Sequence, residues 1–374
     1  MDFNLSEREK MIQSTARAFA VKEVLPRAAE IDRTAEFPRE LAREMGRMGY
    51  FGLAYPPEYG GSGSGYVSYA LVIEQLARAS MTVGAIVAVS ILSQESFFRF
   101  GSEAQKKKFL VPLVEGKMLG CFCFTEPATG SDPKGVATKA KLDGRHYVIE
   151  GQKNFISLAP VASQALVFAR DETKRVSAFV VATSTPGFQL REPCETLGLR
   201  GFGASVIYLD SVRVPKGNLV GDKGAGFEIM LEAISVERVG VATQAVGVAQ
   251  AALDLSVEYA GQRIAYEKPI AGMPTIQWLV AEMASRIEAG RWLAYRAAFM
   301  RDQGQSIRND SAMAKLFCSQ MAVEVTRMAM QVHGAYGTMK SLPVERLYRD
   351  AKMTEVYVGV SEIQRAIIAS HLVK

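Results

Sequence analysis

The sequence has few of the residues that build metal sites and disulfide frameworks. It contains four cysteines and three histidines in 374 residues, and no two cysteines have the CxxC spacing of a zinc site. Four cysteines are also too sparse for a disulfide framework in a chain of this length. We therefore expect no bound metal, small buried thiols such as Cys121 and Cys123, and a reducing compartment, which we take to be the cytoplasm.

The sequence also lacks long runs of charged residues of one sign and long runs of apolar residues. Its net charge is +5, and the densest basic run, residues 106–108, follows Ser102 and Gln105 in the pattern of a helix start. A solvated helix face is therefore favoured over a nucleic-acid patch. No uninterrupted stretch of about 18 apolar residues predicts a membrane span, and residues 1–9 resemble structured chain rather than a signal or transit peptide.

What is present is the composition of an ordinary globular protein, 48% hydrophobic and 22% charged, with enough length for two or three domains. Helical patterns dominate residues 1–119, short β-branched runs separated by turns dominate 120–223, and long helical patterns dominate 224–374. We therefore predict three domains, namely a helical one, an antiparallel β-barrel-like one and a four-helix bundle. The long helices are expected at residues 227–262, 274–303, 310–333, 343–353 and 361–372.

The first change from a helical to a β-type sequence pattern is followed by the stretch from Cys121 to Ser131, which we call the first junction. An apolar run ends there in hydroxyls, a proline and Gly130, followed by Asp132. Freed backbone N–H groups and the hydroxyls of Thr125 and Ser131 suit a loop that binds a polar ligand.

Seven short motifs in a fixed order carry a resemblance to the acyl-CoA dehydrogenase family, and it covers the whole chain. Each motif alone is weak, but the order is specific. The motifs are 59–61 (Tyr-Gly-Gly), 124–132 (Phe-Thr-Glu-Pro-Ala-Thr-Gly-Ser-Asp), 151–157 (Gly-Gln-Lys-Asn-Phe-Ile-Ser), 221–227, 331–337, 343–346 and 349–352.

The resemblance implies FAD as cofactor, α,β-dehydrogenation of an acyl-CoA thioester, and an electron-transfer flavoprotein as electron acceptor. It places the first junction along one edge of the flavin and Phe155 against its ring, where the family commonly has tryptophan. Ser131 would also reach the thioester ligand. The implied flavin contacts are Phe122, Phe124, Thr125, Gly130, Ser131, Phe155, Ile156, Ser157, Val360 and Glu362. The alternative for residues 155–157 is a strand entering the core.

A second group of residues is implied to bind the FAD of a neighbouring subunit, so that the site is complete only in an oligomer, a dimer of dimers. This group comprises Arg263, Gln331, Gly334 and Ala335. Pro274, Ala335 and Thr338 depart from residues that are common in the family at these positions.

The position of the catalytic base is the most informative difference between this sequence and the common family pattern. The reaction removes the α-proton of the thioester, which requires a carboxylate facing the α-carbon. Many members carry this Glu in a Tyr-Glu-Gly-Thr segment, but here Val358 occupies its position. Isovaleryl-CoA dehydrogenase-like members carry it on the first bundle helix instead, where this chain has Glu237. The resemblance thus implies Glu237 as base, with Ser235, Val236 and Arg238 beside the thioester or the CoA arm.

Other interpretations of these residues remain open. From the residues alone, Glu237 and Arg238 suit a buried or interfacial ion pair. Glu355 and Glu362 are competing carboxylates, and His333 suits packing near FAD better than proton transfer. The scaffold also suits an acyl-CoA oxidase, an enoyl-CoA reductase, or an inactive flavin- or CoA-binding homologue. A short branched or alicyclic acyl group is the first expectation, because the moved base recurs in branched-chain members.

Overall fold

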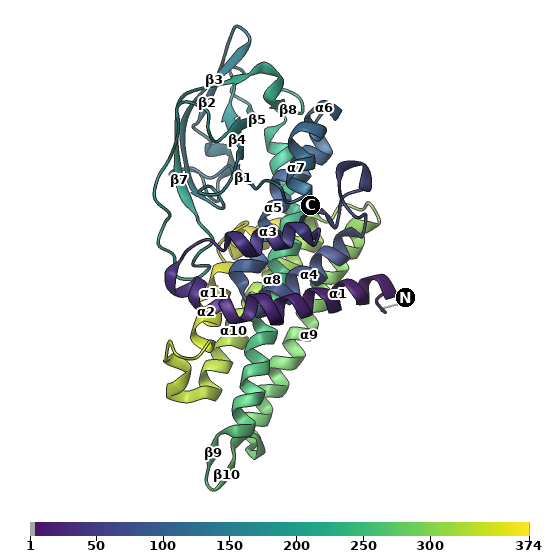
Figure 1. Cartoon of the computed structure of the whole chain (residues 1–374), viewed down its shortest axis with the longest axis vertical. Helices are drawn as coiled ribbons and strands as arrows, with labels where there is room; N and C mark the ends of the chain where they lie inside the picture. Colours follow the sequence, from purple (N-terminus) through teal and green to yellow (C-terminus); the bar gives the residue numbers. More distant parts are fainter. Residues whose placement is uncertain (1–3, 374) are drawn as a thin grey trace.

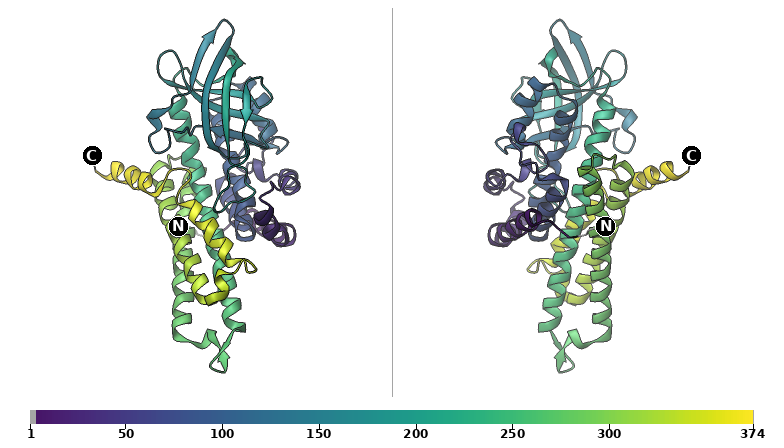
Figure 2. Two further views of the ribbon diagram at one scale, coloured as in Figure 1. Left: turned by 90° about the vertical axis from the view of Figure 1, so that its left-hand side faces the viewer. Right: turned by 90° about the vertical axis from the view of Figure 1, so that its right-hand side faces the viewer.

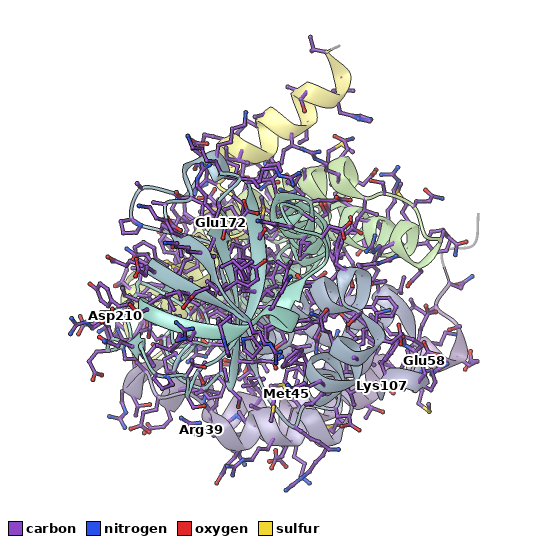
Figure 3. All side chains as sticks on the ribbon, turned by 90° about the horizontal axis from the view of Figure 1, so that it is seen from above. Arg39, Met45, Glu58, Lys107, Glu172 and Asp210 are labelled. Carbon is purple, nitrogen blue, oxygen red and sulfur yellow. The ribbon has the colours of Figure 1, made fainter. Side chains whose placement is uncertain are left out.

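The computed structural model describes residues 4–373 and places the sheet, the N-terminal helices and the long helices along one axis (Figure 1). The start of the N-terminal segment, residues 1–3, lies outside the described residues, as does residue 374. Three parts are confirmed, namely an N-terminal helical part, a central β-sheet and a C-terminal helical part. Figure 3 shows the sheet end from above, with α3, which carries Arg39 and Met45, along one side.

The N-terminal helices begin with a capping box. The Ser6 side chain accepts from the Glu9 N–H, and the Glu9 carboxylate accepts from the Ser6 N–H, as the pattern predicts. The first helix then passes through a π turn and a 3₁₀ turn that contains Pro26, so proline changes the helix type there. The helices are α1 (Glu7–Phe19), α2 (Ala28–Thr34), α3 (Arg39–Arg47), α4 (Gly65–Ala79), α5 (Met81–Phe100), α6 (Glu103–Gln105) and α7 (Val111–Val114).

Helix α5 is the most apolar of these elements. By mean hydropathy, rather than by an uninterrupted apolar run, it is long and apolar enough to cross a membrane. Within the protein, however, 89% of that segment is buried. It packs against α4 and α8, so it is a core helix of the folded chain.

The central sheet has more strands than the sequence indicated, and not all of them are antiparallel. β1 pairs in parallel with β4, and one residue pair joins β2 to β4 in parallel. Both pairings join segments distant in sequence, so local patterns do not reveal them. The described pairing runs from β6 to β8 without closing. The strands are β1 (Gly120–Cys123), β2 (Lys139–Asp143), β3 (His146–Ile156), β4 (Gln164–Arg170), β5 (Val176–Ala182), β6 (Phe188–Leu190), β7 (Ser205–Pro215) and β8 (Leu219–Val220).

Strand β1 separates two hydrophobic cores. Cys121 and Cys123 face the core inside the sheet, whereas Phe122 and Phe124 face the large core shared with the helices, because successive side chains of a strand point to opposite faces. All four cysteines are free. The loop after β1 therefore leaves the sheet directly beside the helical core.

The C-terminal part is built on α8, which has 37 residues. α9 and α10 pack along it, and α11 crosses both α8 and α10, while α12 projects sideways from the bundle (Figure 2). Pro274, which departs from the family pattern, opens α9 at the first helical position, where proline is favoured. The elements are α8 (Gly226–Gln262), β9 (Ile264–Ala265), β10 (Lys268–Pro269), α9 (Pro274–Asp302), α10 (Arg308–His333), α11 (Val344–Thr354) and α12 (Ser361–Leu372).

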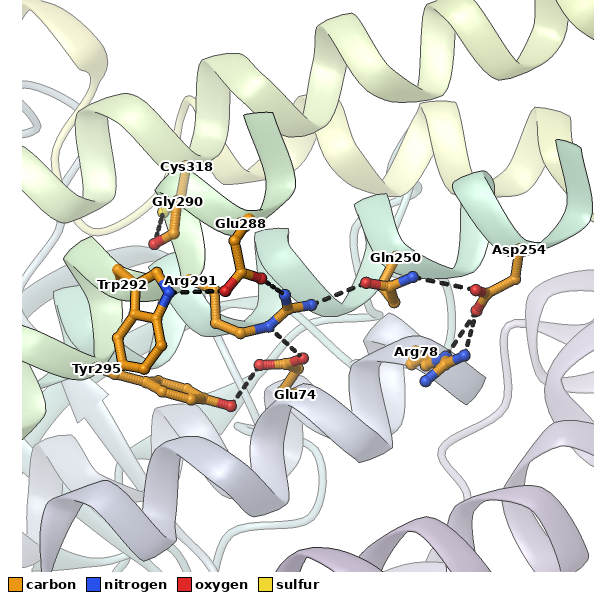
Figure 4. A network of polar contacts seen from close by, with 10 residues as sticks. All are labelled: Glu74, Arg78, Gln250, Asp254, Glu288, Gly290, Arg291, Trp292, Tyr295 and Cys318. Atoms are coloured by element: carbon orange, nitrogen blue, oxygen red, sulfur yellow. Dashed lines mark hydrogen bonds and ion pairs between the residues drawn. The ribbon is translucent and has the colours of Figure 1, made fainter. Parts of the chain in front are cut away.

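A polar network joins α4 to the long helices. Arg291 of α9 donates to Glu74 Oε1 of α4 at 3.1 Å and to Gln250 Oε1 of α8 at 2.8 Å. Figure 4 shows how the network continues to Tyr295, Asp254 and Arg78. Because Glu74 is buried and paired, the network fixes how the N-terminal helices sit on α8.

Candidate active site

The loop after β1 is held in place by a buried ion pair. Glu126 accepts from the backbone N–H groups of Ala137 at 2.6 Å and Thr138 at 3.1 Å, and its Oε1 lies 2.7 Å from Lys153 Nζ. Burial alone would raise the pKa of the Glu126 carboxyl, but the Lys153 charge and these hydrogen bonds hold that pKa below its usual value. The pair stays charged, and β3 thereby positions the loop.

Phe155 stands at the end of β3 and faces outward. The pairing of β3 with β7 shifts register between Lys153 and Ile156, and such a bulge re-aims the side chains within it. Phe155 is 66% exposed with φ 56°, a left-handed conformation that is uncommon for an aromatic residue. Ile156 is buried and Ser157 half-buried. The alternative of a strand entering the core therefore holds for Ile156, which ends β3 in the core of the sheet, but not for Phe155, which points outward.

The residues of the first junction fit a flat ligand with polar edges, as FAD has. Phe124 is buried and Phe122 half-buried, so both rings support the loop from the core. Thr125 is half-buried, while Gly130 and Ser131 are exposed. A Cβ atom added at Gly130 would meet nothing within 4 Å. The junction therefore presents hydroxyls and backbone groups to open space, next to an exposed aromatic ring.

Glu237 lies in α8 with no exposed surface. Neither of its carboxylate oxygens has a hydrogen-bond partner among the described residues, and burial raises the pKa of the carboxyl to about 8. The alternative that Glu237 and Arg238 form a buried ion pair is wrong, because Arg238 Nε and Nη1 also have no partner. A buried carboxyl with free oxygens and a pKa near neutrality suits a general base.

Two tyrosines lie close to this carboxyl. Burial, and after it the charge of Glu237, raises the pKa of Tyr69 and of Tyr357 well above the ordinary value. Tyr69 Oη donates to the Ala88 carbonyl of α5 at 3.1 Å, and Tyr357 Oη donates to Gln244 Oε1 at 2.9 Å. Both hydroxyl protons are thus committed to other groups, and the tyrosines enclose Glu237 without pairing with it.

The turn between α11 and α12 holds Val358 in a strained conformation. Its φ is 57°, and Gly359 follows with φ 88°; a β-branched residue rarely adopts such a φ. Gln364 Nε2 donates to the carbonyl oxygens of Val358 (3.2 Å) and Gly359 (2.8 Å), and Lys315 Nζ donates to Gly359 O at 2.7 Å. These hydrogen bonds impose the turn, and the valine that it presents cannot accept a proton.

Two buried cations lie near this turn. Burial, and after it the charge of Arg238, lowers the pKa of Lys315 to about 7, and burial lowers the pKa of Arg238 to about 10. Arg238 Nε and Nη1 have no hydrogen-bond partner among the described residues, so their N–H groups are available to a ligand. Val236 is buried, and the buried Ser235 donates its hydroxyl proton to Leu231 O at 2.7 Å. Contact of these three residues with substrate stays a prediction.

The two competing carboxylates, Glu355 and Glu362, and His333 have the following contacts. Glu355 lies 2.5 Å from Lys352 Nζ. The Glu362 side chain is 79% exposed, with Arg365 at 4.0 Å. His333 is buried, stacks on Tyr259 at 4.4 Å between ring centroids, and contacts Ala329 O through Nδ1 at 2.8 Å. The contacts of Glu355 and His333 agree with structural roles, whereas Glu362 is exposed and its predicted contact with the flavin stays a prediction.

The residues predicted to bind a neighbouring subunit's FAD lie far from Glu237 within one chain. Arg263 follows the last residue of α8, about 39 Å from Glu237 along the helix axis. Its guanidinium lies 6.0 Å from the Tyr336 ring, beside the exposed Gly334 and Ala335. Within one chain Arg263 is therefore remote from Glu237, and the β9–β10 end of the long helices lies opposite the sheet (Figure 1).

Among the residues that the structure describes, two surface hollows have linings that do not include Glu237. One, of about 310 Å³ between α9 and α10, is lined by the exposed Gln331. The other, of about 350 Å³ at the start of α12, is lined by Val360 and Glu362. Among the residues from 4 to 373, no group of His, Cys, Asp or Glu could hold a metal ion.

Sequence reasoning missed the residues that support the site. Lys153 lay inside a quoted motif without a role, while Tyr69, Lys315 and Gln364 were not singled out. A lysine inside the apolar pattern of a helix was an available signal for Lys315, because lysine is rarely fully buried. Tyr69 carried no such signal, since a tyrosine in an apolar helix usually belongs to the core.

We expect Glu237→Gln to reduce the pH dependence of stability. The native carboxyl keeps its proton up to about pH 8, whereas the unfolded chain loses it near pH 4.5. The native state therefore binds more protons in that window, and the free energy of unfolding falls as pH rises through it, by at most about 5 kcal/mol. Glutamine lacks this proton, so urea unfolding from about pH 5 to about pH 8 should show a flatter profile. The exposed Glu228→Gln is the control, and parallel profiles for all three proteins would contradict the assignment.

Three family models match successive parts of the chain. They are described as the N-terminal, middle and C-terminal domains of acyl-CoA dehydrogenase, and they match residues 6–117, 121–212 and 224–373. Together they extend over nearly the whole sequence.

Two curated relatives match over almost their full lengths. The chain is 40% identical to an acryloyl-CoA reductase (NADH) from Anaerotignum propionicum, with 100% of this chain and 96% of the relative covered. It is 38% identical to the mitochondrial short-chain specific acyl-CoA dehydrogenase of Bos taurus, with 99% and 91% covered.

Solved structures show the same architecture. Butyryl-CoA dehydrogenase from Megasphaera elsdenii has a TM-score of 0.98 at 36% identity, with 100% of both chains covered. A glutaryl-CoA dehydrogenase from Mycobacterium smegmatis in complex with FADH2 has a TM-score of 0.94 at 29% identity, with 99% of this chain and 95% of that chain covered.

Proposed function

The chain belongs to the acyl-CoA dehydrogenase family, and from this premise we propose that it dehydrogenates a short, branched or alicyclic acyl-CoA between the α and β carbons. Its cofactor is FAD, as in the family. The observation that carries the proposal is the state of Glu237, which is fully buried with two unpartnered oxygens. Val358, at the other position where the family carries a base, cannot take that role.

Each residue then has a defined task. Glu237 takes the α-proton, and its raised pKa matches it to a weakly acidic carbon acid near neutral pH. Bound FAD supplies the acceptor for the β-hydride. Phe155 supports the flavin ring, and the loop at Thr125 and Ser131 binds its polar edge. The tyrosines around Glu237 exclude water, which keeps the carboxylate reactive.

The opposite direction is a second candidate. Similarity to an acryloyl-CoA reductase (NADH) at 40% identity favours reduction of an enoyl-CoA on the same scaffold. NADH would then be the electron donor, the β-carbon would receive its hydride from bound reduced FAD, and Glu237 would donate the proton to the α-carbon. An acyl-CoA oxidase remains a further candidate. We consider an inactive homologue less favoured, because Glu237 is fully buried with two unpartnered oxygens and Phe155 is exposed beside the loop after β1.

For the electron acceptor we propose an electron-transfer flavoprotein, and for the assembly a dimer of dimers in the cytoplasm. Support for the assembly comes from Arg263, which lies about 39 Å from Glu237 along α8 and, with Gly334, would serve a neighbouring subunit's FAD. An exposed Tyr336 ring beside Arg263 offers the same partner an aromatic contact.

The deciding experiment is anaerobic reduction of the bound flavin by a panel of acyl-CoAs. Isovaleryl-, isobutyryl-, butanoyl- and cyclohexanecarbonyl-CoA should bleach the flavin absorbance, and the branched or cyclic members should do so fastest. Fast reoxidation of the reduced protein by oxygen would identify an oxidase, and fast reoxidation by electron-transfer flavoprotein a dehydrogenase. Reduction of the flavin by NADH, followed by its reoxidation with an enoyl-CoA, would identify a reductase. A flavin that no acyl-CoA reduces and no enoyl-CoA reoxidises would refute the proposal.

A further inference from the structure

Around Glu237, helix α8 is less deeply buried on its N-terminal side than on its C-terminal side. On the N-terminal side, Leu231, Glu232 and Ile234 are half-buried. From Val236 to Ala249 every residue of the helix is buried. A chain that reaches Glu237 therefore comes from the N-terminal side of the helix, and its far end points toward the residues that follow Glu237.

Tyr69 of α4 stands on that C-terminal side. A Cβ atom added at Gly240, one helical turn beyond Glu237, would lie 2.5 Å from Tyr69 Oη and 3.2 Å from Ala88 Cβ. Tyr69 is 3% exposed, and its hydrogen bond to the Ala88 carbonyl holds the ring in this position. The three helices α4, α5 and α8 thus meet at one phenol, about 5 Å along the axis from Glu237.

Beyond Tyr69 the helices are in direct backbone contact. A Cβ at Gly247 would meet the Glu74 carbonyl oxygen of α4 at 2.5 Å, and a Cβ at Gly84 would meet Ala77 Cβ at 3.0 Å. Glycine at both positions lets the helices approach until no side chain separates them. No space for a ligand remains there, so any space for an acyl chain ends at the tyrosine.

We propose that Tyr69 determines substrate specificity by closing the acyl site one helical turn beyond Glu237, which limits the enzyme to short acyl groups. This inference rests on the proposed function and deepens it. Tyr69 does not transfer protons, because its hydroxyl donates to Ala88. Its contribution is the volume of its ring, and the glycine at 240 is what leaves room for its oxygen.

The test is the chain-length profile of Tyr69→Ala, measured on the FAD-loaded protein. We expect kcat/KM for octanoyl-CoA relative to butanoyl-CoA to rise by at least about 10-fold, since one methylene in an apolar pocket is worth about 10–200-fold in discrimination. Tyr147→Ala is the matched control, because Tyr147 is also 3% exposed but lies in the core of the sheet. It should lower stability and leave the ratio unchanged.

A second pair of variants keeps the proposal testable if Tyr69→Ala fails to fold. Gly240→Ala should depress kcat/KM most for the longest acyl group that the parent accepts, because its methyl would collide with Tyr69 Oη. Tyr69→Phe in the same chain removes that oxygen and should restore the parent profile. An unchanged chain-length ratio in Tyr69→Ala, or in Gly240→Ala, overturns the proposal. Failure of the proposed function is distinct, because it appears in the parent as a flavin that no acyl-CoA bleaches.

Discussion

Glu237→Gln should retain bound FAD and lose flavin reduction by acyl-CoA by a factor of about 10²–10⁴, the usual contribution of a general base. Glutamine has nearly the shape of glutamate, so the fully buried site should keep its packing. It cannot accept the α-proton, and Val358 offers no substitute. The measurement is the rate of flavin bleaching in anaerobic stopped flow, with FAD content taken from the absorbance of the purified protein.

The pH profile strengthens this test. In the parent, bleaching should rise with pH until the Glu237 carboxyl is ionised, since its pKa is raised to about 8 and only the carboxylate accepts a proton. In the variant the residual rate should not follow that ionisation. Glu228→Gln, an exposed change on the same helix, should behave as the parent. If Glu237→Gln bleaches at the parent rate, another group removes the proton.

Lys153→Met should destabilise the protein by about 3–5 kcal/mol, because it leaves the buried Glu126 carboxylate without its counter-charge. Lys153 Nζ also donates to the carbonyl oxygens of Phe124 (3.3 Å) and Phe168 (2.6 Å), and a thioether replaces neither bond. The loop that follows Phe124 should lose its position, so FAD content should fall too. Urea unfolding and flavin absorbance measure the two effects.

Two further variants isolate the charge. Lys153→Met combined with Glu126→Gln removes both charges and should recover part of the lost stability, as buried pairs do when replaced together. Lys223→Met removes a partly exposed pair with Glu172 and should cost no more than about 1 kcal/mol. Equal losses for Lys153→Met and Lys223→Met would show that the buried pair does not hold the loop.

The sequence indicated the order of the three parts and the long helices, because these depend on local periodicity. It singled out Glu237 and Phe155 through motif order; Glu237 is fully buried and Phe155 is exposed, and their roles stay predictions. It did not reveal the parallel pairing of β1 with β4, since strands 40 or so residues apart in sequence pair through tertiary contacts. It also did not reveal Tyr69, whose importance arises only where α4, α5 and α8 converge.

The backbone conformation of Val358 is a second feature that the sequence did not predict. Nothing in a valine predicts a φ of 57°, and the residue alone favours extended backbone. The conformation is imposed by Gln364 and Lys315, which bond the turn from two other segments. A pattern of residue types does not carry such information, because one of these hydrogen bonds comes from Lys315 in another helix and the others depend on how Gln364 folds back onto the turn.

The length of α8 constrains how this protein can change. The helix carries Glu237 in its first half and leads directly into Arg263 at its end. One inserted residue between them would turn Arg263 by about 100° around the axis and shift it by about 1.5 Å, whereas most substitutions would leave it in place. Insertions and deletions in this span are therefore far more damaging than substitutions. Relatives that place a base in the first half of this helix and an arginine just after its end should keep the same number of residues between them.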